Sequence, residues 1–111
     1  MTIRNNMLNL KSVKKIIFVV IFSMFWPCLS YAADTNKGAE VYTMHCASCH
    51  GVSGVNVMPG APNFAQDEGL MSPDGTLFIS IQSGNAAMPA YRGVLSDQDI
   101  LNVIAYLRTL N

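Results

Sequence analysis

The sequence predicts a small all-α domain, and two observations support this prediction. Apolar residues recur at helical spacing in three segments of residues 33–111, and no segment shows the strict apolar–polar alternation of a β-strand. Gly and Pro gather between those segments, as expected for loops. A chain of 111 residues without an internal repeat has room for one such domain.

The N-terminal region has the three parts of a secretory signal peptide. A basic stretch over residues 11–15 precedes an apolar run over 16–29, and the small residues Ser30 and Ala32 follow. We therefore predict cleavage after Ala32, which divides the chain into a signal peptide, 1–32, and a mature domain, 33–111.

Two other fates of this region were considered. An uncleaved membrane anchor is less favoured because the apolar run is shorter than the roughly 20 residues that span a bilayer. A lipid on Cys28 is disfavoured because Pro27, rather than a small residue, precedes it. We expect no stable membrane span in the mature form.

The predicted mature domain is acidic. It holds three Lys and Arg residues against seven Asp and Glu residues, which leaves a net charge of −4. Nucleic-acid binding is therefore not expected, because phosphate contacts need basic patches. The charge favours partners with a basic docking face, mainly through the association rate.

The first predicted helix starts at the capping residues 34–36 and runs to about Ala47. Val41, Tyr42 and Cys46 share one face at helical spacing, so we expect Tyr42 to be a core residue. A long loop, 51–71, follows and is rich in Gly and Pro. Such a loop is unusual in a compact domain unless it wraps a ligand.

Two further helices are predicted after this loop. One starts at Ser72-Pro73-Asp74, with Ser72 as its cap, and ends at Gly84. The other starts at Ser96, where Asp99 completes a capping-box pattern. Their apolar stripes are Leu77, Phe78 and Ile81 in the first, and Ile100, Val103, Ile104, Leu107 and Leu110 in the second.

The strongest chemical signal is the run Cys46-Ala47-Ser48-Cys49-His50. Cys-x-x-Cys-His is read as a c-type haem attachment site, in which two thiols bond the porphyrin and the histidine binds iron. A thioredoxin-like redox pair needs a βαβ unit that is absent here. A zinc site needs ligands from separated segments, and a bare disulfide would need neither His50 nor the long loop.

The second iron ligand is predicted to be Met88, because haem of this type takes His and Met as axial ligands. Met88 lies in the loop after the second predicted helix, and Pro89 stiffens its backbone. Met58 also precedes a proline and stays the alternative, although it follows His50 closely and so reaches the opposite haem face less easily. For any of these methionines, the alternative to an iron ligand is a residue that fills the core.

These motifs make residues 33–111 resemble the class I cytochromes c, in particular the short bacterial mono-haem type. The resemblance rests on the haem motif and on the segments Gly60-Ala61-Pro62-Asn63-Phe64, Met88-Pro89-Ala90-Tyr91 and Ile104-Ala105-Tyr106-Leu107. It implies a close crossing of the first and last helices at Gly38 and Tyr106. It also implies that the carbonyl of Pro62 accepts a hydrogen bond from His50, which would orient the ring.

With His and Met both on iron, haem has no open position for a substrate. We therefore expect a periplasmic, monomeric one-electron carrier between redox partners, not an enzyme, with one covalently attached haem c. The alternative is a gas sensor or peroxidase with an open iron site. It lacks support because only His45 is spare as a distal group. Arg92 reads as a surface residue, with a haem propionate as its other candidate partner.

Overall fold

The computed structural model describes residues 10–24 and 31–111 and divides the chain after Tyr31 into two compact units. The first unit contains helix α1, Leu10–Met24. Of the helices that the structure describes, none is long and apolar enough to cross a membrane. Cys28 and Ser30 lie outside the described residues, so the cleavage after Ala32 stays a prediction.

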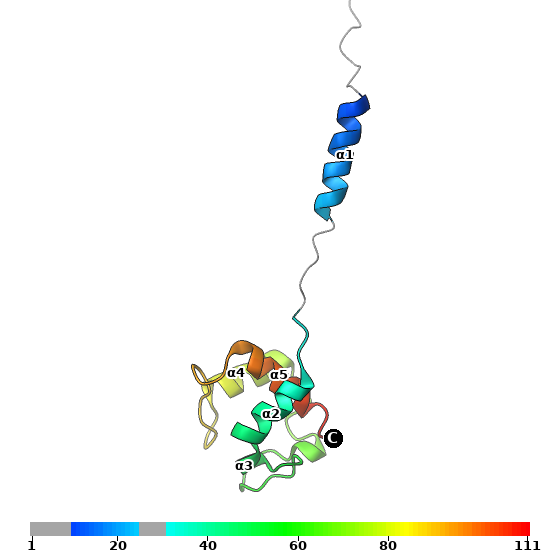
Figure 1. The fold of residues 1–111 in the computed structure, drawn as a ribbon. Coiled ribbons are helices and arrows are strands. Elements are labelled where there is room, and N and C mark those ends of the chain that lie inside the picture. The colour runs from blue at the N-terminus through cyan, green and yellow to red at the C-terminus, as the bar shows by residue number, and fades with distance from the viewer. Residues whose placement is uncertain (1–9, 25–30) are drawn as a thin grey trace, which may run out of the picture. The chain divides into compact units, whose positions relative to one another are not determined.

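The second unit, Ala32–Asn111, is built from helices joined by loops (Figure 1). Its regular elements are α2 (Thr35–His45), α3 (Ala47–His50), the 3-10 turn η1 (Phe64–Gln66), α4 (Asp74–Ser83) and α5 (Asp97–Leu107). Residues 31–111 contain isolated β-bridges but no named strand. The all-α prediction is confirmed. The long loop was also predicted, but the η1 turn inside it was not.

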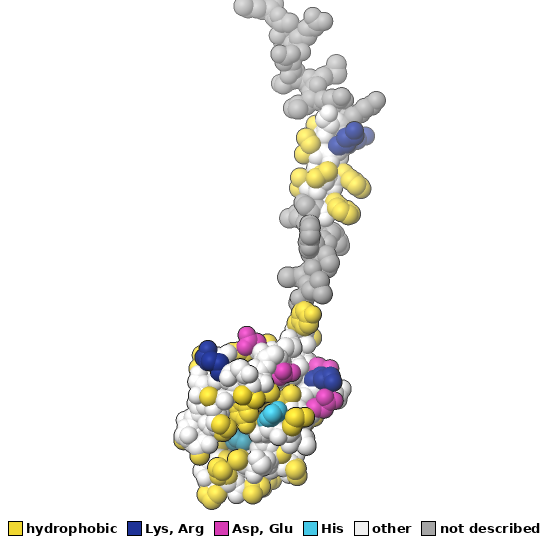
Figure 2. Space-filling view, turned by 60° about the vertical axis from the view of Figure 1, so that its left-hand side comes forward, with side chains coloured by type: hydrophobic (Ala, Val, Ile, Leu, Met, Phe, Trp, Pro, Cys, Tyr) yellow, Lys and Arg dark blue, Asp and Glu magenta, His cyan; other side chains and the backbone are white. Residues whose placement is uncertain are grey.

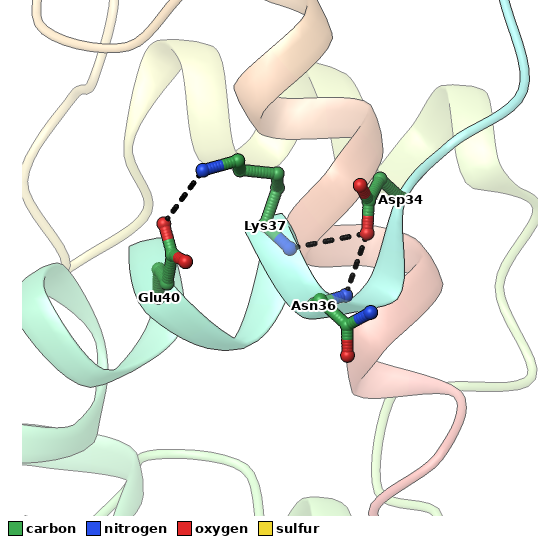
Figure 3. Close-up of polar contacts among 4 residues, drawn as sticks. All are labelled: Asp34, Asn36, Lys37 and Glu40. Carbon is green, nitrogen blue, oxygen red and sulfur yellow. Dashed lines mark hydrogen bonds and ion pairs between the residues drawn. The ribbon is translucent and has the colours of Figure 1, made fainter.

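Helix α2 begins as the sequence predicts. The Asp34 carboxylate caps it by accepting hydrogen bonds from the backbone N–H groups of Asn36 and Lys37, at 2.8 and 3.3 Å. One turn along, Lys37 forms an exposed ion pair with Glu40 at 3.2 Å (Figure 3). Such a surface pair adds little stability, so the cap is the stronger determinant of where α2 starts.

Helix α2 packs against α5, and this pair forms the centre of the domain (Figure 1). At Gly38 the backbones approach so closely that an added Cβ would overlap the carbonyl of Asn102 and lie 2.8 Å from Cβ of Tyr106. One turn on, the ring of Tyr42 lies 5.3 Å from that of Tyr106. The close crossing implied by the family resemblance is therefore present.

The α2–α5 pair buries most of the apolar stripe that the sequence predicts for the last helix. Tyr42 is fully buried, which confirms its core position. The other buried hydrophobic residues of the domain are Ala47, Phe64, Leu70, Ile100, Val103, Ile104 and Leu107. The cores of α2, η1 and α5 are thus one cluster, and Val41, Cys46 and Leu110 pack at its edge.

The start of α4 differs from the prediction. Pro73, not Ser72, occupies the cap position, and no side chain caps the helix. Pro73 has φ of −57° and ψ of 149°, outside the helical region, so the helix starts at Asp74, one residue later than predicted. The Ser72 carbonyl accepts a hydrogen bond from Arg108 at 2.8 Å, and Arg108 also pairs with Asp74 at 2.6 Å. The predicted end at Gly84 is confirmed, with φ of 77°.

Helix α5 carries the predicted capping box. The Ser96 hydroxyl accepts from the backbone N–H of Asp99, and the Asp99 carboxylate accepts from that of Ser96, both at 3.1 Å. The Ser96 hydroxyl also donates to the Asp99 carboxylate at 2.6 Å, and this bond, followed by the one from the Ser96 backbone N–H, lowers the pKa of Asp99. The start of α5 is therefore fixed by local chemistry that is readable in the sequence.

Candidate functional site

The Cys-x-x-Cys-His run lies where α2 ends and α3 begins. Cys46 is both the C-cap of α2 and the N-cap of α3. The single helix predicted to run to about Ala47 is therefore two helices that meet at Cys46. The backbone bond from His50 N to Cys46 O, 3.0 Å, makes Cys46 to His50 one helical turn. Both cysteines are half-buried free thiols. One tight turn therefore presents two thiols and one imidazole together.

The environment of Cys46 keeps its thiol protonated. Burial, and secondarily the neighbouring Cys49, raises the pKa of Cys46 to about 11. Within residues 10–24 and 31–111, no group of three or more His, Cys, Asp and Glu side chains is placed to hold a metal ion.

His50 is held in one orientation from two sides. Its Nδ1 lies 3.3 Å from the carbonyl oxygen of Pro62, and since a carbonyl only accepts, this bond places the proton on Nδ1. The Phe64 ring stacks on the imidazole with centroids 4.5 Å apart and planes at 18°. The side chain is 7% exposed. Nε2 is thereby left with a free lone pair, which is the form that binds iron.

Tyr42 fixes the chain immediately after His50. Its hydroxyl donates to the carbonyl of Gly51 at 2.7 Å, and burial raises the pKa of Tyr42 to about 12. Gly51 has φ of 79°, and a Cβ there would collide with the backbone of Val55. The loop can therefore turn sharply after His50 only because this position is glycine.

The same loop returns to the attachment turn. The backbone N–H groups of Val57 and Met58 both donate to the carbonyl of Cys49, at 2.9 and 3.0 Å. Met58 is thus tethered beside the attachment segment itself, and its side chain is 37% exposed. Met58 and His50 are therefore held on the same segment of the chain.

Met88 lies at the end of a tight turn that follows α4. Asn85 and Met88 exchange backbone hydrogen bonds of 3.1 and 2.9 Å, which close a tight turn after α4. A Cβ on Gly84 would lie 2.8 Å from the carbonyl oxygen of Met88, so the turn needs glycine there. The side chain of Met88 is half-buried, whereas those of Met44 and Met71 are 76% and 89% exposed. Burial thus separates Met88 from Met44 and Met71.

The segment after Met88 is tied back to α4 and to α2. The backbone N–H groups of Tyr91 and Arg92 donate to carbonyls of α4, Ile81 and Gln82, at 3.1 and 3.0 Å. The Tyr91 hydroxyl donates to the carbonyl of His45 at 2.7 Å. Sequence reasoning gave Tyr91 no role, and it could not, because its partner lies 46 residues away.

Arg92 lies on the surface, in agreement with the favoured sequence interpretation. Its guanidinium donates to the side-chain oxygen of Gln82 at 2.9 Å and has no carboxylate partner among the described residues. On the face of the domain shown in Figure 2, hydrophobic side chains gather around the histidines, and the charged side chains lie farther out. The histidines on this face therefore lie among apolar side chains.

Comparison with known proteins decides the family. Residues 33–107 match the family described as "Cytochrome C oxidase, cbb3-type, subunit III". The chain is 32% identical to a cytochrome c6 of Picosynechococcus sp. over 110 residues, covering 91% of this chain and 92% of that protein. The chain belongs to the class I mono-haem cytochromes c.

Two further relatives agree with this assignment. Cytochrome c6 of Thermostichus vulcanus is 34% identical over 95 residues and covers 82% of each chain. The crystal structure of cytochrome c6 from the diatom Phaeodactylum tricornutum matches with a TM-score of 0.57 and 27% identity, over 69% of this chain and 93% of that one.

The family assignment confirms several predictions. This cytochrome is an electron carrier rather than an enzyme, its cofactor is haem c, and it works with redox partners. A gas sensor or peroxidase is not favoured. None of these matches tests which residues hold the haem, so the roles of Cys46, Cys49, His50, Pro62 and Met88 rest on the geometry above.

Proposed function

We propose that this cytochrome is an exported, monomeric one-electron carrier that holds its haem through Cys46 and Cys49 and ligates iron with His50 and Met88. The observation that carries the proposal is the Cys46–His50 turn, which presents two thiols and an imidazole whose Nδ1 lies 3.3 Å from the Pro62 carbonyl oxygen. A half-buried Met88 on the loop after α4 supplies the candidate second ligand. When bound, the haem supplies a reversible Fe(II)/Fe(III) couple.

The residues around this site keep its ligands in place. The Pro62 carbonyl and the Phe64 ring hold the imidazole of His50 in one orientation. The paired backbone bonds between Asn85 and Met88 hold the sulfur-bearing residue. Ligands that are already positioned need little movement when iron changes charge, and small rearrangement is what fast electron transfer requires.

Met88 is favoured over Met58 by where the chain carries each residue. The N–H of Met58 is bonded to the carbonyl of Cys49, beside the attachment turn, whereas Met88 is carried by the loop between α4 and α5. Met44 and Met71 are 76% and 89% exposed and have no shelter of this kind. The Met88 sulfur is a neutral ligand, which would favour Fe(II) over Fe(III) and so raise the reduction potential.

Export and the periplasm are supported by the N-terminal sequence and by the extent of the family match. The match starts at residue 33, next to the predicted cut after Ala32. The helix of the first unit, α1, has 15 residues, fewer than the roughly 20 that a membrane span needs. The net charge of −4 in residues 33–111 suits redox partners with a basic docking face.

The ligand assignment is tested by voltammetry of the purified holoprotein and of two matched variants. We expect Met88→Ala to lower the reduction potential and to make ferrous iron bind carbon monoxide. Met58→Ala removes a side chain of the same kind and should leave both properties unchanged. The reverse pattern would assign the ligand to Met58. No change in either variant would show that neither Met88 nor Met58 binds iron.

A further inference from the structure

Besides its chain connections to α4 and α5 and its hydrogen bonds to α4, the loop that carries Met88, residues 84–95, has one hydrogen bond to another part of the described domain, and the donor is a side chain. Tyr91 reaches across to the end of α2, where its hydroxyl donates to the carbonyl of His45 at 2.7 Å. Its ring also meets the His45 imidazole edge-on, with centroids 5.9 Å apart and planes at 78°. Among the described residues, no other hydrogen bond joins residues 84–95 to α2 or α3.

The position of this bond gives it a specific consequence. His45 is the residue immediately before Cys46, so the bond ties the Met88 loop to the segment that carries the haem-attachment cysteines. The remaining bonds of the loop run within it or to α4, through Tyr91 N and Arg92 N. They would survive if the loop and α4 moved away from α2 together.

We propose that Tyr91 is a positioning residue that clamps the Met88 loop to the haem-attachment segment and so keeps the methionine sulfur on iron. The proposal rests on Met88 being the ligand. It assigns to the hydroxyl a role in retaining that ligand, beyond the general stability of the fold. A phenylalanine at this position would keep the ring contact with His45 and lose the clamp.

The expected effect follows from the strength of one hydrogen bond. A bond of this kind contributes about 1 kcal/mol net, which is about fivefold in an equilibrium at 1.4 kcal/mol per tenfold. In Tyr91→Phe, the fraction of molecules with the Met88 loop open should therefore rise about fivefold. A ligand that binds only the open form should then bind about fivefold more tightly.

The test is a titration of the ferric holoprotein with imidazole. Binding is monitored by the loss of the sulfur-to-iron absorption band. Thr109→Val is the matched control, because it removes a side-chain hydroxyl that donates to a carbonyl over the same 2.7 Å, on Tyr106, at the end of α5. We expect Tyr91→Phe to bind imidazole about fivefold more tightly than wild type. Thr109→Val should leave the affinity for imidazole unchanged.

A second measurement separates the clamp from global stability. On heating, the gap between the temperature at which the sulfur band is lost and the helix-unfolding midpoint should be larger in Tyr91→Phe than in wild type, and unchanged in Thr109→Val. Unchanged imidazole affinity in Tyr91→Phe, or an equal gain in Thr109→Val, would overturn the proposal. A wild-type protein with no sulfur band would refute Met88 ligation itself, and the clamp with it.

Discussion

Replacing Gly38 by alanine tests the helix crossing that supports the haem-attachment turn. In an open helix this change is favourable by about 1 kcal/mol. At Gly38, however, the new Cβ would overlap the carbonyl of Asn102 and lie 2.8 Å from Cβ of Tyr106. Carbon atoms in contact normally lie about 3.5–4.0 Å apart, so α2 and α5 would have to separate.

That separation would disturb more than one contact. The backbone N–H of Asp34 donates to the Asn102 side chain at 2.9 Å, and the Tyr42 and Tyr106 rings lie 5.3 Å apart across the same interface. Overpacking of this kind typically costs about 1–3 kcal/mol. We therefore expect Gly38→Ala to lose about 2 kcal/mol net, or about 8 °C or more in melting temperature.

The assay is denaturant unfolding of the holoprotein, with Gly75→Ala as control. Gly75 lies in α4 with nothing within 4 Å of an added Cβ, so alanine there should be neutral or stabilising by up to about 1 kcal/mol. A Gly38→Ala protein as stable as wild type would refute the close crossing. Equal destabilisation by both variants would show that the effect is not specific to that crossing.

Two further predictions concern the attachment turn and the start of α5. Replacing both Cys46 and Cys49 by alanine should abolish covalent haem, so acid–acetone extraction should leave none on the protein; retained haem would contradict attachment there. Ser96→Ala should lose about 1 kcal/mol of stability, measured by urea unfolding, because the cap of α5 is lost. Because the folded-state pKa of Asp99 is lowered, its contribution is present at neutral pH and is lost as the pH falls through that pKa. Wild type and Asp99→Asn should therefore converge in stability in acid, and a gap that widens in acid would contradict the capping box.

Local chemistry made most of the helices predictable. Asp34 and Ser96 signal their helices through short-range bonds to the backbone, and Gly84 ends α4 because it accepts a positive φ at no steric cost. The break at Cys46 was not predictable, because neither glycine nor proline marks it. The cap of α4 was misplaced by one residue because Pro73 takes an extended ψ of 149° and so stays outside the helix.

The candidate site was likewise predictable from the sequence only in part. The spacing of Cys46, Cys49 and His50 names its chemistry from sequence alone. The contacts that position it are long-range: the Tyr91 hydroxyl finds a carbonyl 46 residues away, which no local pattern encodes. The Met58 tether to Cys49 is likewise a product of the loop's path. Sequence therefore indicates which groups react, and the fold shows which of them are held in place.

The visible spectrum of the mature holoprotein, oxidised and reduced, with and without carbon monoxide, tests the central claim most directly. We expect a sulfur-to-iron band in the ferric form and no shift of the ferrous spectrum with carbon monoxide, because His50 and Met88 occupy both axial positions. A missing sulfur band together with ready carbon monoxide binding would show an open iron site and contradict His50/Met88 ligation.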